Sequence, residues 1–291
     1  AGALPVDFAA LSAAGAVAFS DDGNTVANAR VLRDAALLAL AVPGVFISHA
    51  EDEDLKGDAV MSAGAVADAL GMPGAPSVSE DVIVARDLLI GMDTGKSWHI
   101  AHLSTARALD LVRWARAHGA RATCEVTPHH LLLTDATVRE RGAAGKVNPP
   151  LRTEEDAAAL RAAVRDGTID VFATDHAPHT VAEKSDDLRA AAVGFTGLEI
   201  ALGAYALALP DLPLARFVAL LSTNPARILG VEGGTLRKGA RADVTIFADR
   251  DWVVDPATFA SKGKSTPFAG RTLPRRALAT IVGGEQRWRS G

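Results

Sequence analysis

The sequence has little cysteine, little net charge and no long apolar run, and each shortage excludes a class of protein. The one cysteine among 291 residues, Cys124, excludes an intrachain disulfide and a zinc site built from several thiolates. Thirty basic residues against thirty-five acidic ones leave a net charge of −5, which argues against nucleic acid or an anionic membrane as the main partner. No segment reaches the roughly 20 apolar residues of a membrane-spanning helix.

The beginning of the chain lacks three further features. It has no basic segment of the kind that opens a signal peptide, and it has no initiator methionine. The first histidine is His49 and the first lysine is Lys56. We therefore expect the chain to begin inside a longer protein, and the single cysteine favours a reducing, cytoplasmic location.

The residues that are present are those of a globular enzyme, with 48% apolar and 22% charged residues. Short apolar runs alternate with longer helical patterns, which predicts a parallel sheet covered by helices. Strands are expected at 16–20, 44–48, 98–103, 121–126 and 169–174, and helices at 27–40, 79–90, 105–118, 154–165, 198–209 and 214–221. After Gly230 short apolar segments alternate with turns. We therefore predict two units, 1–230 and a small β module at 231–291.

Four acidic or histidine residues stand where expected strands end: Asp22, His49, His102 and Asp175. In a parallel α/β barrel these strand ends meet on one face, where catalysis takes place. Two imidazoles and two carboxylates gathered there are suitable zinc ligands. One strand-end histidine alone is more often a hydrogen-bonded core residue, so the prediction depends on all four.

Residues 98–102 contain two histidines three positions apart, so they face opposite sides of a regular strand. We choose His102 as the ligand because it is nearer the end of the strand, and we expect His99 to pack or to support a ligand. Asp175 opens the segment 175–179 (DHAPH), in which its carboxylate could bind a metal and move a proton. The alternative for this segment is a helix-capping aspartate followed by loop histidines.

Residues 173–179 (ATDHAPH) resemble a signature of dihydroorotases in the amidohydrolase superfamily. Further segments resemble that family in the family's own order: 127–131 (TPHHL), 147–152 (VNPPLR), 194–199 (GFTGLE), 222–226 (STNPA) and 234–243. The resemblance covers essentially the whole chain. It implies an incomplete TIM-type (β/α) barrel with about five of the eight strands, followed by part of a β-sandwich.

The resemblance also implies an activity, the zinc-dependent, reversible cyclisation of N-carbamoyl-L-aspartate to L-dihydroorotate in pyrimidine biosynthesis. It assigns His49, His102 and Asp175 to the metals, two zinc ions in a complete site, with Asp175 as general base and then acid. Asn148, His179 and Gly194 are implied to bind the small-molecule substrate. Many relatives bridge their metals with a carbamylated lysine, but no lysine precedes Lys56. Residues 20–23 (SDDG) instead resemble a bacterial branch that uses an aspartate, which we place at Asp22, with Asp21 as the alternative.

Other parts of the family pattern are missing: the His-x-His pair of the first strand, the arginine that follows it, and a substrate-binding asparagine of the third strand. We expect the sequence to be an N-terminally truncated enzyme that is inactive as an isolated chain. One alternative is a non-catalytic structural partner of aspartate transcarbamoylase, but the retained His49, His102, Asp175 and Asp22 argue against it. Another is a different cyclic-amide hydrolase, such as a dihydropyrimidinase, hydantoinase or allantoinase. A homodimer is also possible.

Overall fold

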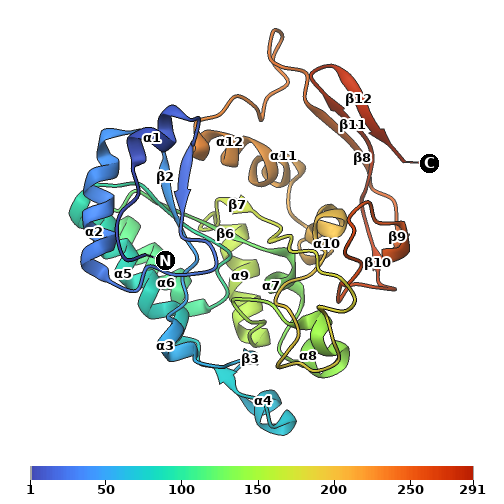
Figure 1. Ribbon diagram of the computed structural model, residues 1–291. Helices are drawn as coiled ribbons and strands as arrows, with labels where there is room; N and C mark the ends of the chain where they lie inside the picture. Colours follow the sequence, from blue (N-terminus) through green and yellow to red (C-terminus); the bar gives the residue numbers. More distant parts are fainter. Residues whose placement is uncertain (1, 291) are drawn as a thin grey trace.

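A parallel sheet forms the centre of the computed structural model, which describes residues 2–290 (Figure 1). Within these residues the sheet has five strands in the order β1-β2-β5-β6-β7, all parallel to their neighbours. The expected α/β class and the five barrel strands are therefore confirmed. The strands are β1 (Ala18–Ser20), β2 (Val45–Ser48), β5 (Trp98–Ile100), β6 (Ala122–Val126) and β7 (Val171–Phe172).

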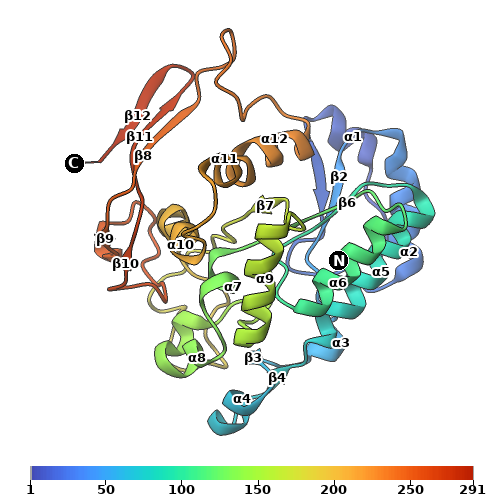
Figure 2. The ribbon, with the colours of Figure 1, turned by 180° about the vertical axis from the view of Figure 1, so that it is seen from behind.

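Helices cover the outer side of this sheet (Figure 2). Several begin at residues that can cap them: Asn28 accepts backbone hydrogen bonds at the start of α2, Thr105 at α6, and Thr153 forms a capping box with Asp156 at α9. No helix within residues 2–290 is long and apolar enough to cross a membrane. The helices of this region are α1 (Phe8–Ala13), α2 (Ala29–Leu38), α3 (Glu53–Lys56), α5 (Val78–Thr94), α6 (Ala106–Ala117), α7 (Pro128–Leu132), α8 (Ala136–Arg141), α9 (Glu154–Asp166), α10 (Ala201–Ala208), α11 (Leu214–Val218) and α12 (Asn224–Leu229).

The main core lies between the sheet and these helices. In β6 the exposure alternates: Cys124 and Val126 are buried on the helix side, while Thr123 and Glu125 point to the other side and stay partly accessible. Trp98 of β5 is buried and its ring packs edge-on against Phe46 of β2. Apolar side chains therefore hold the outer face of the sheet, and the polar residues are left on the inner face.

A short arm projects from the sheet between β2 and β5. It consists of β3 (Met61–Ser62), α4 (Ala65–Leu70) and β4 (Gly74–Ala75), and Figure 1 shows it extending away from the body of the molecule. The sequence reasoning did not find this arm, because strands of two residues carry no alternating pattern that could be recognised.

The C-terminal part contains a second, antiparallel sheet in the order β12-β11-β8, as expected for a β module. Its strands are β8 (Val244–Ala248), β11 (Arg276–Val282) and β12 (Glu285–Arg289), and a separate pair joins β9 (Trp252–Val253) to β10 (Thr272–Leu273). Phe259 and Phe268 of this part share a hydrophobic cluster with Phe195 and Ile200 of the preceding part. The boundary at residue 230 stays a prediction.

Several element bounds differ from those expected. Residues 233–239 form no strand, β5 ends at Ile100 rather than at Leu103, and α5 begins at Val78 and continues to Thr94. The helix expected at 27–40 begins at Ala29, after the cap residue Asn28. Two of the strand-end residues, His102 and Asp175, have backbone of positive φ.

Candidate metal centre

His49 and His102 face each other at the carboxyl ends of neighbouring strands. His49 directly follows β2, His102 follows β5 by two residues, and both side chains are buried. Nδ1 of His49 lies 3.0 Å from Nε2 of His102. Burial, and then the charge of His49, lower the pKa of His102, which favours the neutral imidazole that a metal requires.

Glu51 orients the His49 ring by contacting Nε2, the ring nitrogen that does not face His102. Its Oε2 lies 3.0 Å from Nε2 of His49, and Lys56 Nζ donates to the same oxygen over 3.4 Å. Burial acts to raise the pKa of Glu51, but the hydrogen bond to His49 and the Lys56 charge outweigh it, and the pKa is lowered. An ionised Glu51 accepts the proton on Nε2, which leaves the Nδ1 lone pair of His49 directed at His102.

The two adjacent aspartates after β1 have different surroundings. One ligand atom each from Asp22, His49 and His102 lie within 4.8 Å of one another. Asp21 instead accepts from backbone N–H groups, that of His49 over 2.9 Å and that of Val26 over 3.3 Å. Asp22 therefore joins the histidine pair, while Asp21 holds the start of the loop that carries His49.

Asp175 lies beyond the short strand β7. Burial raises its pKa, and the charges of His102 and His49 act in the opposite direction. It is not one of the three residues whose ligand atoms gather within 4.8 Å. The structure thus brings Asp22, His49 and His102 together and places Asp175 nearby.

Both His102 and Asp175 have left-handed backbone, with φ of 31° and 47°. Among residues 2–290 the one other non-glycine residue with positive φ is Arg275. Such a conformation costs about 1–3 kcal/mol in a residue with a Cβ and is concentrated at functional sites. His102 lies two residues beyond β5 and Asp175 three residues beyond β7, so both occur in the loops that follow their strands.

The prediction that His99 and His102 face opposite sides of a regular strand does not apply. The strand β5 ends at Ile100, and the backbone of His102 is left-handed. His99 faces the inner side, where its ring lies 2.8 Å from Thr123 Oγ1 and 3.1 Å from Glu125 Oε2. The same Glu125 accepts from the backbone N–H of His102 over 3.2 Å. His99 and Glu125 therefore support the loop that presents His102.

The residues expected to bind substrate lie in two loops. The peptide bond between Asn148 and Pro149 is cis, and Pro149 O accepts from the ring of His130 over 3.0 Å. His130 is thus occupied in holding the Asn148 loop. The neighbouring His129 is fully buried against Phe195, and burial lowers its pKa well below the ordinary value.

His179 and Gly194 belong to the loop after β7. Nε2 of His179 donates to Val193 O over 2.7 Å. The N–H of Gly194 donates to Lys146 O, and its carbonyl accepts from Lys184 Nζ. Gly194 has φ of +100°, and a Cβ there would lie 2.5 Å from that of Ala177. The glycine is required for this close approach, and its amide is already engaged within the chain.

The residues around His49 and His102 fit a divalent metal ion. Two imidazole nitrogens directed at one another and a carboxylate beside them form a nitrogen and oxygen donor set suited to zinc. Among the described residues, the buried Nδ1 of His102 has no hydrogen-bond partner. The supporting residues Glu51 and Glu125 were missed as such by sequence reasoning, although the spacing His49-x-Glu51 was visible.

Comparison with a protein-family model identifies the family of this chain. The model of the amidohydrolase family matches residues 10–287. The chain belongs to the amidohydrolase family.

Curated relatives place it in the dihydroorotase branch, as expected. It is 45% identical over 287 residues to the dihydroorotase of Syntrophus aciditrophicus strain SB, covering 97% of this chain and 67% of that protein. It is 50% identical over 275 residues to that of Pelotomaculum thermopropionicum, covering 93% and 64%. The chain therefore spans about two thirds of the length of these relatives.

Solved structures of amidohydrolases agree with the fold. The chain matches an L-hydantoinase (dihydropyrimidinase) from Arthrobacter aurescens with a TM-score of 0.85 and 26% identity, covering 99% of this chain and 69% of that one. A D-hydantoinase from Bacillus sp. AR9 matches with a TM-score of 0.84 at 19% identity, covering 97% and 66%. The second likeness concerns the fold alone.

Proposed function

We propose that the protein is a zinc-dependent dihydroorotase of cytoplasmic pyrimidine biosynthesis, which interconverts N-carbamoyl-L-aspartate and L-dihydroorotate. The observation that carries the proposal is the approach of His49 Nδ1 to His102 Nε2 over 3.0 Å, with Asp22 beside them. It occurs in a chain 45–50% identical to two dihydroorotases.

Asp22, His49, His102 and Asp175 would hold the metal, with two zinc ions in a complete site. A bound zinc ion supplies a Lewis acid that polarises a carbonyl and lowers the pKa of water. Glu51 and Glu125 keep the two histidines in place, because each accepts a hydrogen bond from the residue it supports. This arrangement holds the donor atoms ready before substrate binds.

Asp175 carries the proton in both directions. In ring opening, water adds to the amide carbonyl carbon and its proton passes to the Asp175 carboxylate. The carbon–nitrogen bond then breaks, and Asp175 returns the proton to the leaving nitrogen. Ring closure follows the same steps in reverse. The burial of Asp175 and its electrostatic interaction with His102 and His49 support this role.

Asn148 and His179 would bind the acidic, amide-rich substrate through their side chains, and Gly194 would shape the loop that contacts it. The amide of Asn148 can donate to a carbonyl or carboxylate oxygen. To bind substrate through Nε2, His179 would have to give up its hydrogen bond to Val193 O. The Gly194 backbone contributes a close turn rather than a free donor.

Hydrolysis of another cyclic amide is the second candidate, favoured by the likeness to the Arthrobacter aurescens L-hydantoinase at a TM-score of 0.85. The purified complete protein, loaded with zinc, is assayed with dihydroorotate, dihydrouracil, hydantoin and allantoin. We expect turnover of dihydroorotate, its loss on chelation and its return with zinc. Turnover of hydantoin or dihydrouracil in preference to dihydroorotate would assign the second candidate instead.

A small-molecule substrate follows from this activity. A homodimer and an association with aspartate transcarbamoylase remain predictions. A purely structural role in such an association is disfavoured, because it would not require Asp22, His49 and His102 to gather. Chromatography of the complete protein with and without the transcarbamoylase tests both.

A further inference from the structure

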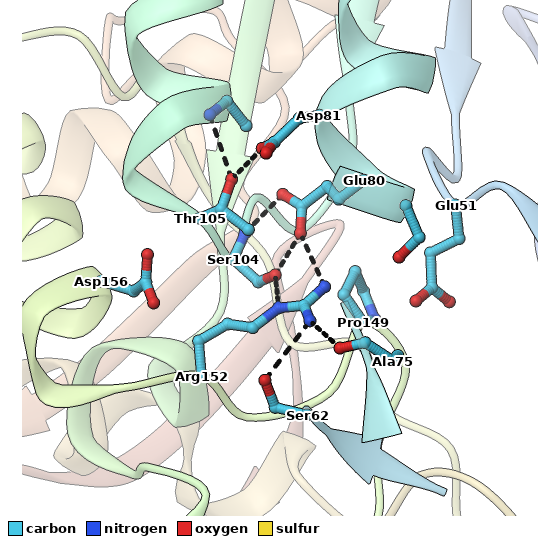
Figure 3. A network of polar contacts seen from close by, with 12 residues as sticks. Glu51, Ser62, Ala75, Glu80, Asp81, Ser104, Thr105, Pro149, Arg152 and Asp156 are labelled. Atoms are coloured by element: carbon cyan, nitrogen blue, oxygen red, sulfur yellow. Dashed lines mark hydrogen bonds and ion pairs between the residues drawn. The ribbon is translucent and has the colours of Figure 1, made fainter. Parts of the chain in front are cut away.

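A buried ion pair, drawn with its contacts in Figure 3, lies outside the cluster formed by Asp22, His49 and His102. Arg152 and Glu80 have side chains that are each 1% exposed, and Arg152 Nη2 lies 3.5 Å from Glu80 Oε2. Glu80 stands in the first turn of α5. Arg152 ends the segment that begins with Asn148, so the pair joins elements that are 72 residues apart in the chain.

Both members of the ion pair form hydrogen bonds with Ser104, which lies two residues after His102. Glu80 Oε1 accepts from the Ser104 backbone N–H over 2.8 Å, and Glu80 Oε2 accepts from the Ser104 hydroxyl. Arg152 Nε donates to the same hydroxyl oxygen over 3.0 Å. Figure 3 shows Ser104 between the cation and the anion. The loop after β5 is thus held by three hydrogen bonds from buried charged groups.

Arg152 also reaches the arm formed by β3 and β4. Its Nη1 donates to Ala75 O over 3.1 Å and to Ser62 Oγ over 3.5 Å. On the other side of Ser104, Thr105 Oγ1 donates to Asp81 over 2.7 Å. One guanidinium therefore fixes the arm, the His102 loop and the Asn148 segment relative to one another.

Stability alone does not explain this arrangement, because well-packed apolar side chains often replace a buried ion pair without loss. We propose that Arg152 and Glu80 are positioning residues that set the metal-binding geometry of His102 and the placement of Asn148. The inference rests on the proposed function. It predicts that disturbing the pair changes metal binding beyond what its effect on stability explains.

The test compares Arg152→Lys with Arg116→Lys in the complete protein. Arg116 forms a distant and more exposed network of the same type, donating to Thr168 O over 2.7 Å, to Ala122 O over 2.9 Å and to Asp170. These partners lie at the amino ends of β6 and β7, away from the cluster. Lysine keeps the charge in both variants and removes the planar fork.

Metal binding is read in two ways, by the zinc affinity from competition with a chromophoric chelator and by the visible spectrum of the cobalt-substituted protein. We expect Arg152→Lys to weaken zinc binding by about 10- to 100-fold, the usual effect of losing an outer-shell partner, and to alter the cobalt spectrum. Arg116→Lys should leave both unchanged. Ser104→Ala keeps the ion pair and should produce a smaller change of the same kind.

Equal zinc affinities and spectra for Arg152→Lys, Arg116→Lys and the unmodified protein would overturn the inference and leave the pair a structural feature. If Arg152→Lys does not fold, Glu80→Gln and Ser104→Ala carry the same comparison. Failure of the unmodified protein to bind either metal would overturn the proposed function, and this inference with it. If this inference alone fails, the unmodified protein still binds zinc and cobalt. If the proposed function fails, it binds neither.

Discussion

At the scale of single residues, Asp21 and Asp22 make different contacts although they are neighbours. Asp22 contributes to the cluster with His49 and His102, while Asp21 accepts two backbone hydrogen bonds. The chain turns at Asp22, where the Asn24 N–H donates to Asp21 O over 2.9 Å, so the two carboxylates reach different surroundings. Substituting Asp21 and Asp22 one at a time therefore distinguishes the metal ligand from the residue that supports the loop.

We expect Asp22→Asn to weaken zinc binding by more than about 100-fold, because an amide oxygen is a poorer donor than a carboxylate. Asp21→Asn keeps an acceptor for the His49 N–H, and its effect should stay within the about 10- to 100-fold range of an outer-shell change. Equilibrium dialysis with zinc analysis measures both. Equal losses in the two variants would contradict the assignment of Asp22.

Gly194→Ala should lower the free energy of unfolding by about 1–3 kcal/mol, since it places a Cβ in left-handed backbone and against Ala177. The distance between the two Cβ atoms would be 2.5 Å, closer than carbon atoms can approach. Gly142→Ala is the control, because φ there is +55° with nothing within 4 Å of the added Cβ. Urea unfolding of both variants measures the difference. An equal cost at the two positions would show that the contact with Ala177 is unimportant.

At the scale of elements, α5 is tied to β2 and β5 by a buried polar group. Ser48 Oγ donates to Asp87 over 2.6 Å and accepts from Trp98 Nε1 over 2.6 Å. Arg86 Nε donates to the other Asp87 oxygen over 2.8 Å. Burial raises the pKa of Asp87 from 3.8 to about 6, against the opposing effect of the Arg86 charge.

This pKa predicts a pH dependence of stability. A pKa that is higher in the folded than in the unfolded protein stabilises the fold fully below about pH 3.8, and the contribution is lost as the pH rises through about 6. The loss amounts to about 3 kcal/mol. Asp87→Asn should remove this slope between pH 4 and 6 in urea unfolding, while the exposed Asp93→Asn in the same helix should retain it. A slope unchanged in Asp87→Asn would refute the assignment.

At the scale of the whole molecule, α10 connects the barrel part to the C-terminal strands. A Cβ at Gly203 would lie 2.8 Å from Pro274 O and 2.9 Å from Leu273 Cβ. Phe259 and Phe268 bury their rings in a cluster with Phe195. The two parts therefore share packed surface, and the helix can approach the segment before β11 only where it has no side chain.

Gly203→Ala should destabilise the protein by about 1–3 kcal/mol, the usual effect of adding a methyl group to a filled core. Gly91→Ala in α5 is the matched control: its Cβ would meet Trp98 at 3.4 Å, an ordinary contact, and alanine favours the helix by about 0.5–1 kcal/mol. Thermal unfolding compares the two. A stabilising Gly203→Ala would show that α10 can move away from the C-terminal strands.

Much of the fold could be predicted because its signals are local. The strand at 45–48 is a short apolar run, and the helix that begins after Thr105 has a capping hydroxyl at its start. These patterns give five parallel strands and place Asp22, His49, His102 and Asp175 after them. The arm at 61–75 and the left-handed backbone of His102 leave no comparable local pattern, so they were not predicted.

The sequence by itself determined the order of strands and helices, the polar residues that follow the strands, and the family, because each depends on neighbouring residues or short motifs. The tertiary structure decided which of Asp21 and Asp22 faces the histidines and that Glu51 orients His49. It also decided that Arg152 and Glu80, 72 residues apart, meet at Ser104. Such contacts depend on how distant segments pack, since chain folding rather than sequence spacing sets the distance between them.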